Sequence, residues 1–222
     1  VKVDKVIGMK VTAEIARIHA HVCGDGYVTV TKENRSRSDA LTHPRKNWIR
    51  TVWTLAYCNT SKKLIKEFKN DLKKAFNRKG LYVPKKFDIR VSGAKHIINF
   101  LELENKNSKN WVVPKFVTNS SNKILANWIR AFFDDEATVD VSRKAILVSS
   151  INKKGLIQIS RLLRRFKINS KIKGPYYYKI YVSWRLSIRS ENVSKYYKKI
   201  SFIHPQKLRK IKKIKMGPGG LS

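Results

Sequence analysis

Two acidic side chains, Asp25 and Glu136, stand at matched places where a protein could do metal-assisted chemistry on phosphate. Each is the eighth residue of a stretch that ends an apolar helical pattern and runs directly into a strand-like segment. Carboxylates are disfavoured at a helix C-terminus, where the backbone dipole is negative, and two adjacent carboxylates repel each other as well. Mg²⁺ would relieve this conflict, because it binds carboxylates, backbone carbonyls, water and substrate phosphate oxygens. The pair therefore indicates a metal-dependent phosphodiesterase centre.

Two helices must position these acids, and both are visible as patterns. Apolar residues recur at the spacing of one helix face, and a second stripe in each stretch is small or compact at every fourth residue. The apolar stripes are Val11, Ile15, Ile18 and Val22, then Leu125, Trp128, Ile129, Phe132 and Phe133; the compact stripes are Ala16, Ala20 and Gly24, then Asn127, Ala131 and Asp135. Such stripes predict two helices that pack closely and in parallel, with Asp25 and Glu136 side by side at their C-terminal ends.

The stretches 18–26 (IHAHVCGDG) and 129–137 (IRAFFDDEA) resemble the paired LAGLIDADG motifs of single-chain homing endonucleases, most of all the archaeal intron-encoded members. The first stretch departs from the usual wording at His19, His21 and Cys23, and Ala137 replaces the usual closing glycine of the second. The resemblance implies a monomer with an internal pseudo-twofold axis. It also implies site-specific double-strand cleavage of DNA across the minor groove, leaving short 3′ overhangs.

The composition agrees with a polyanionic partner. Lys and Arg number 49 against 15 acids, a net charge of +34, which is far more than solubility requires. An anionic membrane is the other candidate, but no apolar run approaches the roughly 20 residues of a spanning helix. No signal peptide is evident, and Cys23 and Cys58 lack any zinc-ligand spacing, so we expect a cytoplasmic protein in a reducing compartment.

The order of predicted elements repeats after half the chain. We expect an α+β fold of two αββαββα halves joined by the paired motif helices, with antiparallel sheets forming a saddle for DNA. The predicted boundaries are a first half at 1–104, a linker at 105–120, a second half at 121–207 and a basic, partly disordered tail at 208–222. Each half is too small to bury its sheet and helices alone, so the halves should share a core.

A sheet with one polar, basic face suits the DNA major groove, where each base pair presents a distinct pattern of donors and acceptors. We expect most of the remaining lysines to contact phosphates. The residues expected to bind DNA are Arg35, Arg37, Arg45, Trp48, Arg50, Arg90, Lys179, Tyr181, Arg185, Ser187 and Arg189. We expect Ile49, Trp53 and Leu55 to point inward from their strand.

The family resemblance also implies a basic residue near each scissile phosphate and a polar residue that orders water at the end of the second strand of each half. The catalytic residues implied in this way are Asp25, Glu136, Lys109, Lys207, Asn59 and Asn152, and the expected metal ligands are Asp25, Glu136, Gly24 and Asp135. The expected cation is Mg²⁺, with Mn²⁺ as a substitute and Ca²⁺ supporting binding without cleavage. Lys109 and Lys207 could equally be plain phosphate contacts.

Two other functions compete with a DNA endonuclease. An intron RNA-binding maturase would need a similar basic surface, and a non-catalytic DNA-binding regulator could keep the fold without the chemistry. Retention of Asp25 and Glu136 argues against the regulator, whereas the maturase stays open. We expect His19 and His21 to be packing residues, and the run 176–178 (YYY) to be strand surface and core. Because the ends lack the residues used in protein splicing, we expect a free-standing, intron-encoded protein rather than an intein.

Overall fold

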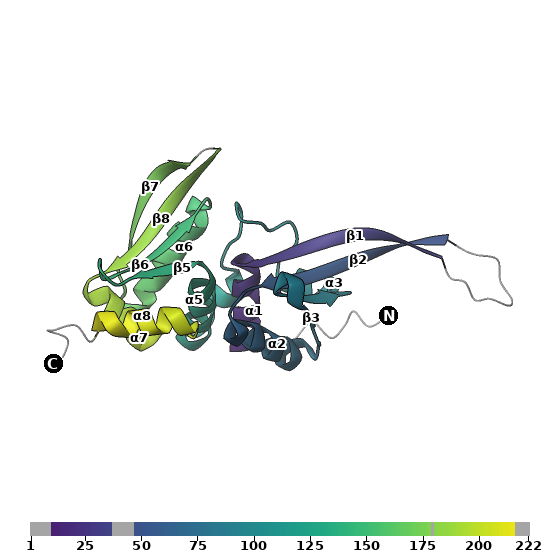
Figure 1. Cartoon of the computed structure of the whole chain (residues 1–222), viewed down its shortest axis with the longest axis horizontal. Coiled ribbons are helices and arrows are strands. Elements are labelled where there is room, and N and C mark those ends of the chain that lie inside the picture. Colours follow the sequence, from purple (N-terminus) through teal and green to yellow (C-terminus); the bar gives the residue numbers. More distant parts are fainter. Residues whose placement is uncertain (1–9, 37–46, 179, 216–222) are drawn as a thin grey trace.

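The structure, a computed structural model, describes residues 10–36, 47–178 and 180–215. It consists of two halves of the same topology that meet at a central pair of helices, α1 and α5 (Figure 1). Each half places a four-stranded sheet on one side of the molecule and helices beneath it. The expected α+β architecture with two pseudo-symmetric halves is confirmed.

The first half runs from the first motif helix to the segment that links the halves. Its elements are α1 (Ala13–Cys23), β1 (Gly26–Ser36), β2 (Asn47–Cys58), α2 (Lys62–Phe76), β3 (Leu81–Val83), the 3₁₀ turn η1 (Pro84–Lys86), β4 (Asp88–Ser92) and α3 (Lys95–Phe100). A short helix, α4 (Lys115–Thr118), lies within the linking segment.

The second half repeats this order. Its elements are α5 (Asn122–Glu136), β5 (Ala137–Asp140), β6 (Ala145–Ser150), α6 (Lys153–Leu163), the 3₁₀ turn η2 (Arg164–Phe166), β7 (Lys171–Tyr178), β8 (Tyr181–Arg189), α7 (Glu191–Lys199) and α8 (Pro205–Lys215). Relative to the first half, it adds α8 at its C-terminal end.

Both sheets are antiparallel and have equivalent strand orders, β1-β2-β4-β3 and β5-β6-β8-β7. The strand that follows each motif helix pairs in the same way with the next strand: Gly26 lies opposite Tyr57, and Ala137 lies opposite Val148. Figure 1 shows that the β1–β2 hairpin is the long one in the first half and the β7–β8 hairpin is the long one in the second. The sheets are therefore related by topology but differ in reach.

Local sequence explains where the motif helices begin and how closely they pack. The Thr12 side chain accepts a hydrogen bond from the backbone N–H of Ile15, and the Ser121 side chain accepts one from that of Ile124. These bonds cap the N-termini of α1 and α5. The small residues Ala16, Ala20 and Ala131 are fully buried. Because no large side chain separates the helices along this stripe, their backbones can approach closely.

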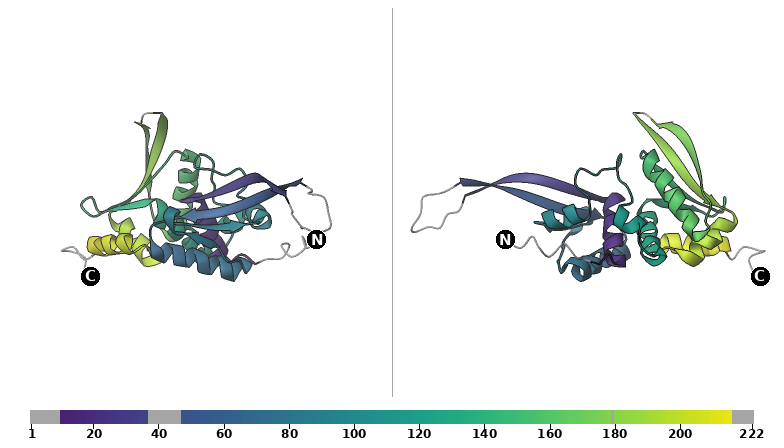
Figure 2. Two further views of the ribbon diagram at one scale, coloured as in Figure 1. Left: turned by 45° about the vertical axis from the view of Figure 1, so that its right-hand side comes forward. Right: turned by 180° about the vertical axis from the view of Figure 1, so that it is seen from behind.

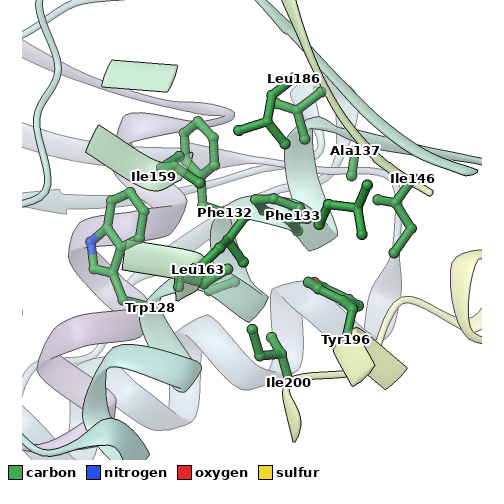
Figure 3. Packing of buried hydrophobic residues seen from close by; sticks show 14 of the residues in the cluster. Trp128, Phe132, Phe133, Ala137, Ile146, Ile159, Leu163, Leu186, Tyr196 and Ile200 are labelled. Carbon is green, nitrogen blue, oxygen red and sulfur yellow. The ribbon is translucent and has the colours of Figure 1, made fainter. Parts of the chain in front are cut away.

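Two hydrophobic clusters meet at these helices. The cluster of the second half is built on Trp128, Phe132 and Phe133 of α5, and Figure 3 shows these rings packed among side chains of the sheet, α6 and α7. Residues Ala16 and Ala20 of the first motif helix belong to this second cluster. The first motif helix therefore helps to complete the core of the other half, as the small size of each half predicts.

Two expectations about the periphery are wrong. Ile49 is 69% exposed instead of inward-facing, because the β1–β2 hairpin extends beyond the helices that cover the sheet. Residues 208–215, the first part of the expected basic tail, are not a solvated arm but belong to α8, in which Ile211 is 1% exposed and packs into the second cluster. The residues 216–222 lie outside the described part of the chain.

Two further properties bear on the environment of the protein. In the part of the chain that the structure describes, no helix is both long enough and apolar enough to cross a membrane. Cys23 and Cys58 are free thiols and are half-buried.

Candidate active site

The C-terminal ends of α1 and α5 touch each other. A Cβ atom built on Gly24 would lie 2.9 Å from both Cβ and Oδ2 of Asp135, which is closer than side-chain atoms can approach. Gly24 and Asp135 occupy the same position of the two motifs, so only one of them can carry a side chain at this contact. The acids that follow, Asp25 and Glu136, therefore leave adjacent helix ends, as the motif spacing predicts.

Asp25 lies in a cavity of about 300 Å³ that both halves line. The Asn59 side chain donates a hydrogen bond from Nδ2 to Asp25 Oδ2 at 2.9 Å, while Asn59 Oδ1 accepts the backbone N–H of Ser61 at 2.8 Å. Lys207 of α8 lines the same cavity. The first acid is thus oriented by an amide that is itself held at both ends.

Glu136 lines a different cavity, of about 350 Å³. Its lining contains serine and tyrosine hydroxyls and the indole of the linking segment, namely Ser108, Trp111, Ser149, Ser150, Tyr181 and Ser183. No basic side chain lines this cavity among the described residues. The two acids therefore face unequal surroundings, although their motif positions are equivalent.

The surroundings of Asp25 and Glu136 disfavour the charged forms of both carboxylates. Burial and the charge of Asp135 raise the pKa of Asp25 to about 6. Burial and the charges of Asp25 and Asp135 raise the pKa of Glu136 to about 7. Lys207 partly offsets both shifts. Both groups thus resist ionisation, and a bound cation would stabilise their charged forms.

Asp135 is a predicted metal ligand, but its carboxylate has protein partners instead. Its carboxylate accepts a hydrogen bond from His21 Nδ1 at 2.8 Å and one from the Tyr57 hydroxyl at 2.7 Å, and Asn59 Nδ2 lies 3.4 Å away. Its side chain is fully buried. Because three protein donors occupy its oxygens, we leave Asp135 out of the proposed metal ligands.

His21 is an ionic residue rather than a packing residue. Burial lowers its pKa, but the charges and hydrogen bonds of Asp135 and Glu67 outweigh burial and raise the pKa to about 9. Glu67 of α2 approaches His21 Nε2 at 3.5 Å. His19 behaves as expected for a buried neutral ring, because burial lowers its pKa to about 3 and its Nδ1 accepts the indole N–H of Trp128 at 3.0 Å.

A network of buried charges continues below the acids. Glu67 accepts a hydrogen bond from Arg130 Nη2 at 2.7 Å, and Arg17 forms a bidentate pair with Asp71, with distances of 2.6 and 2.7 Å. Arg17 also donates to Asn127 of the other motif helix at 2.8 Å. These contacts tie α2 to both motif helices, so the base of the site is rigid.

Lys207 completes the end of α5. Its ammonium group donates to the carbonyls of Phe133, Asp134 and Asp135 at 3.2, 2.5 and 2.9 Å. Cations are favoured at helix C-termini, where carbonyls have no intrahelical partner. Burial lowers the pKa of Lys207, although the acids around it act in the opposite direction. A lysine of the second half thus lies beside the acid of the first half, Asp25.

Two of the predicted catalytic side chains lie elsewhere. Lys109 is exposed, and only its neighbours Ser108 and Trp111 line the cavity of Glu136. Asn152 is 4% exposed, and its side chain caps α6 through Gly155 N at 2.9 Å and donates to the carbonyl of Trp111 at 2.6 Å. Asn152 is therefore a structural residue whose amide is already fully used.

The register of the sheets explains the misplacement of Asn152. Because Gly26 opposes Tyr57 and Ala137 opposes Val148, Asn59 is equivalent to Ser150, two residues further along in each half. Ser150 lines the cavity of Glu136, as Asn59 lines that of Asp25. The sequence offered no signal for Ser150, because the pairing of strands had to be known first.

The second sheet carries exposed arginines on the face that points away from the helices. Arg185 and Arg189 of β8 are exposed. Arg185 donates to the Ser149 hydroxyl at 3.3 Å, and its guanidinium lies 5.1 Å from the centroid of the Tyr176 ring. Tyr181, nearer the hairpin tip, is 49% exposed. These side chains are available to a ligand that lies across the sheet.

Other residues expected to bind DNA differ in availability. Ser187 is only 9% exposed and its hydroxyl donates to the carbonyl of Lys171 at 3.3 Å, so it offers little surface to a ligand, and its contact with DNA stays a prediction. In the first sheet, Arg50 is exposed. Arg90 is half-buried and paired with Asp88 at 2.8 Å, which neutralises part of its charge.

The remaining predicted DNA contacts fall where the structure is not described. Arg37, Arg45 and Lys179 lie outside the described residues. Arg35 and Trp48 oppose each other in the register of β1 and β2, but the described residues do not include their side chains. These assignments stay predictions.

Comparison with known proteins agrees with this architecture. Residues 123–201 match the family model of the LAGLIDADG-like domain. A structure of variants of the homing endonuclease I-DmoI matches with a TM-score of 0.62 at 17% identity, covering 85% of this chain and 90% of that one. I-DmoI in complex with DNA and Mn gives 0.61 at 17% identity, with coverages of 85% and 96%. The I-LtrWI LAGLIDADG homing endonuclease bound to target DNA gives 0.51 at 13% identity, with coverages of 92% and 90%.

A curated relative matches over a shorter length. Elongation factor 2 of Methanopyrus kandleri is 30% identical over 103 residues, which are 46% of this chain and 8% of that protein. Because so little of the elongation factor is covered, its activity carries no argument here. The family match and the solved structures lead to one conclusion: residues 123–201 are similar to the LAGLIDADG-like domain, and the chain as a whole has the fold of the LAGLIDADG homing endonucleases.

Proposed function

We propose that this chain is a site-specific DNA endonuclease that uses a divalent cation. The observation that carries the proposal is the placement of Asp25 and Glu136, two carboxylates of raised pKa, at the touching ends of α1 and α5. A folded protein gains no stability from such a pair, so a functional partner is the physical reason to keep it. Because one chain supplies both acids, we expect the active species to be a monomer.

The chemistry of the donors fits Mg²⁺ or Mn²⁺. No group of three His, Cys, Asp or Glu side chains converges on one point within the described ranges, and Mg²⁺ characteristically takes one or two carboxylates with carbonyls, water and phosphate oxygens. Asp25 and Glu136 would hold the cation, with Gly24 at the adjoining helix end. When bound, the cation would supply Lewis-acid activation of water and of the scissile phosphate. Ca²⁺ should support DNA binding without cleavage.

The neighbouring side chains have distinct roles in this proposal. Asn59 fixes the direction of the Asp25 carboxylate, and its fixed amide can also position a water molecule. Lys207 keeps a positive charge at the end of α5, where it would stabilise the negative charge that develops on the phosphate. In the cavity of Glu136, Ser150 takes the position that Asn59 has in the cavity of Asp25, and its hydroxyl can position a water molecule there.

The two sheets would supply sequence recognition. Two sheets that each contact base edges and are separated by the motif helices suit an asymmetric DNA target. Such a target is longer than either sheet could contact alone. Arg185 and Arg189 are the best-placed readers of guanine in the second half-site, because arginine can donate to both acceptors of guanine in the major groove. Cleavage across the minor groove with short 3′ overhangs, at an intron-insertion site, belongs to the same proposal.

The proposal is tested by incubating the protein with a library of randomised DNA duplexes and sequencing the cut ends. We expect a single long asymmetric sequence to be cut on both strands with Mg²⁺ and no cutting with EDTA. Two outcomes contradict the proposal. One is the absence of any defined cleavage product; the other is selective, tight binding of structured RNA without DNA cleavage, which would favour the maturase.

A further inference from the structure

The segment that links the two halves does not run along the helical side of the molecule. After α3, the chain rises between the two sheets and then descends to α5, as the teal trace shows in Figure 1 and in both views of Figure 2. This rise is on the side of the molecule where the sheets present their exposed faces.

The raised part of the segment reaches the ends of both motif helices. Ser108 and Trp111 line the cavity of Glu136, and both also line a second cavity with Gly24 and Gly26. The segment therefore lies beside Glu136 and beside the two glycines that flank Asp25 in the sequence.

The raised part is a built turn with its own hydrogen bonds. The backbone N–H of Asn107 donates to Asn110 Oδ1 at 2.7 Å, and that of Lys109 donates to Asn107 Oδ1 at 2.9 Å. Asn110 Nδ2 donates to the carbonyl of Asn105 at 2.9 Å, where the backbone has a positive φ of 58°. Asparagine tolerates that conformation and closes turns with its side chain.

Both ends of the turn are clamped into the core. Leu103 before it is 1% exposed and Trp111 after it is 3% exposed. The carbonyl of Trp111 accepts the Asn152 bond described above, and a Cβ on Gly155 would lie 2.5 Å from the Trp111 ring, so the indole fits only against glycine. The turn is thus presented in one orientation, which lowers the entropy cost of binding a ligand.

The side chains that the turn presents are suited to nucleic acid. Asn107, Ser108 and Lys109 are exposed, and Lys106 is half-buried beside the end of α1. Glu104 is the single acid of the stretch 103–111, against two lysines. Lysine and asparagine are among the residues that bind minor-groove edges and flanking phosphates.

We infer that residues 105–111 form a third DNA-contacting element, which binds the backbone of the central base pairs while the two sheets occupy the flanking major grooves. A minor groove lies between two successive major grooves on one side of a duplex, and it faces the space between the sheets. Lys109 then acts as a phosphate contact rather than as a group in the cavity of Glu136. The inference rests on the proposed DNA endonuclease function.

The test replaces Lys106 and Lys109 by alanine together and uses a duplex recovered from the cleavage library. Hydroxyl-radical footprinting in Ca²⁺ should show that the double variant loses protection of the central sugars while both flanking protections remain. For the double variant, the slope of the logarithm of the binding constant against the logarithm of salt concentration should become shallower. The change should be roughly 0.9 for each lost phosphate contact, or about 2 in total. A second variant, Asn107→Gly with Asn110→Gly, loosens the turn without changing charge and should weaken the same central protection.

Lys123→Ala is the matched control, because Lys123 is exposed at the opposite end of α5 from Glu136. It removes one lysine charge, against two in the double variant, and should leave the footprint unchanged. If the double lysine variant keeps the wild-type central protection and salt slope, or binds DNA more tightly, the inference is overturned while the proposed function stands. If the wild type recovers no duplex from the library, the proposed function itself has failed, which is a distinct result.

Discussion

His21 of one motif helix donates a hydrogen bond to Asp135 of the other at 2.8 Å, with both side chains fully buried. This ionic contact joins the two halves at the level of the candidate active site. It also consumes the carboxylate that stands where the first motif has Gly24. The two acids left free for a cation are therefore Asp25 and Glu136.

The His21–Asp135 pair predicts a specific loss of stability. His21→Phe leaves the Asp135 carboxylate buried without its cationic partner, which should lower the free energy of unfolding by about 3 kcal/mol at neutral pH. Urea unfolding followed by circular dichroism measures it. His19→Phe is the control, because it removes a neutral ring, and it leaves the Trp128 N–H and the Cys23 thiol without their His19 partner at a cost of about 1–3 kcal/mol.

The pH dependence of that loss separates the ionic contact from simple packing. The pKa of His21 is raised from 6.5 to about 9 on folding, so its charge stabilises the protein fully below about pH 6.5 and progressively less as pH rises through about 9. The stability gap between the wild type and His21→Phe should therefore shrink over that interval. A gap that stays constant would show that His21 contributes only packing.

The two asparagines once expected in the site should behave differently. Asn152→Ala removes the cap of α6 and the bond to Trp111, so it should destabilise the protein by about 1–2 kcal/mol. Asn59→Ala releases Asp25 at the surface of its cavity, so it should slow cleavage strongly with little loss of stability. Thermal melts measure the stability of both variants, and their cleavage rates are then measured below their melting temperatures. Equal effects of the two changes on the cleavage rate would contradict the assignment.

The exposed face of β8 predicts a loss of sequence discrimination. Arg185→Ala should relax preference at one or two base pairs, with about 1–3 kcal/mol of discrimination lost. Lys212→Ala on α8 should instead weaken binding to all sequences alike and reduce the salt slope by about 1. Competition binding to a panel of single-base-pair variants separates the two patterns. The sheet-reading interface is wrong if both variants weaken specific and random DNA equally.

Much of this architecture was predictable from local pattern. The apolar and compact stripes predict the two motif helices, and the repeated order of elements predicts two halves of the same topology. The matched acids Asp25 and Glu136 followed from repetition alone. These features depend on residues close in sequence, or on the same pattern occurring twice.

The features that the sequence does not predict depend on contacts between segments that are far apart along the chain. His21 looked like a packing residue because its partners Asp135 and Glu67 are far away along the chain. Ser150 was overlooked because its equivalence to Asn59 appears only once strand register is known. The sequence predicts a tail at 208–215, because the many charges there obscure the spacing that buries Ile211.

The central claim is that Asp25 and Glu136 together support metal-dependent cleavage. Its most direct test is strand-resolved cleavage of the library-selected duplex by the wild type, Asp25→Asn and Glu136→Gln in Mg²⁺. Binding to the same duplex is measured in EDTA, where no divalent cation screens the carboxylates. Each variant should lose cleavage or become strongly biased to one strand, and each should bind DNA at least as tightly as the wild type, because carboxylate–phosphate repulsion is relieved. If both variants cut both strands at wild-type rates, the metal-site account is contradicted.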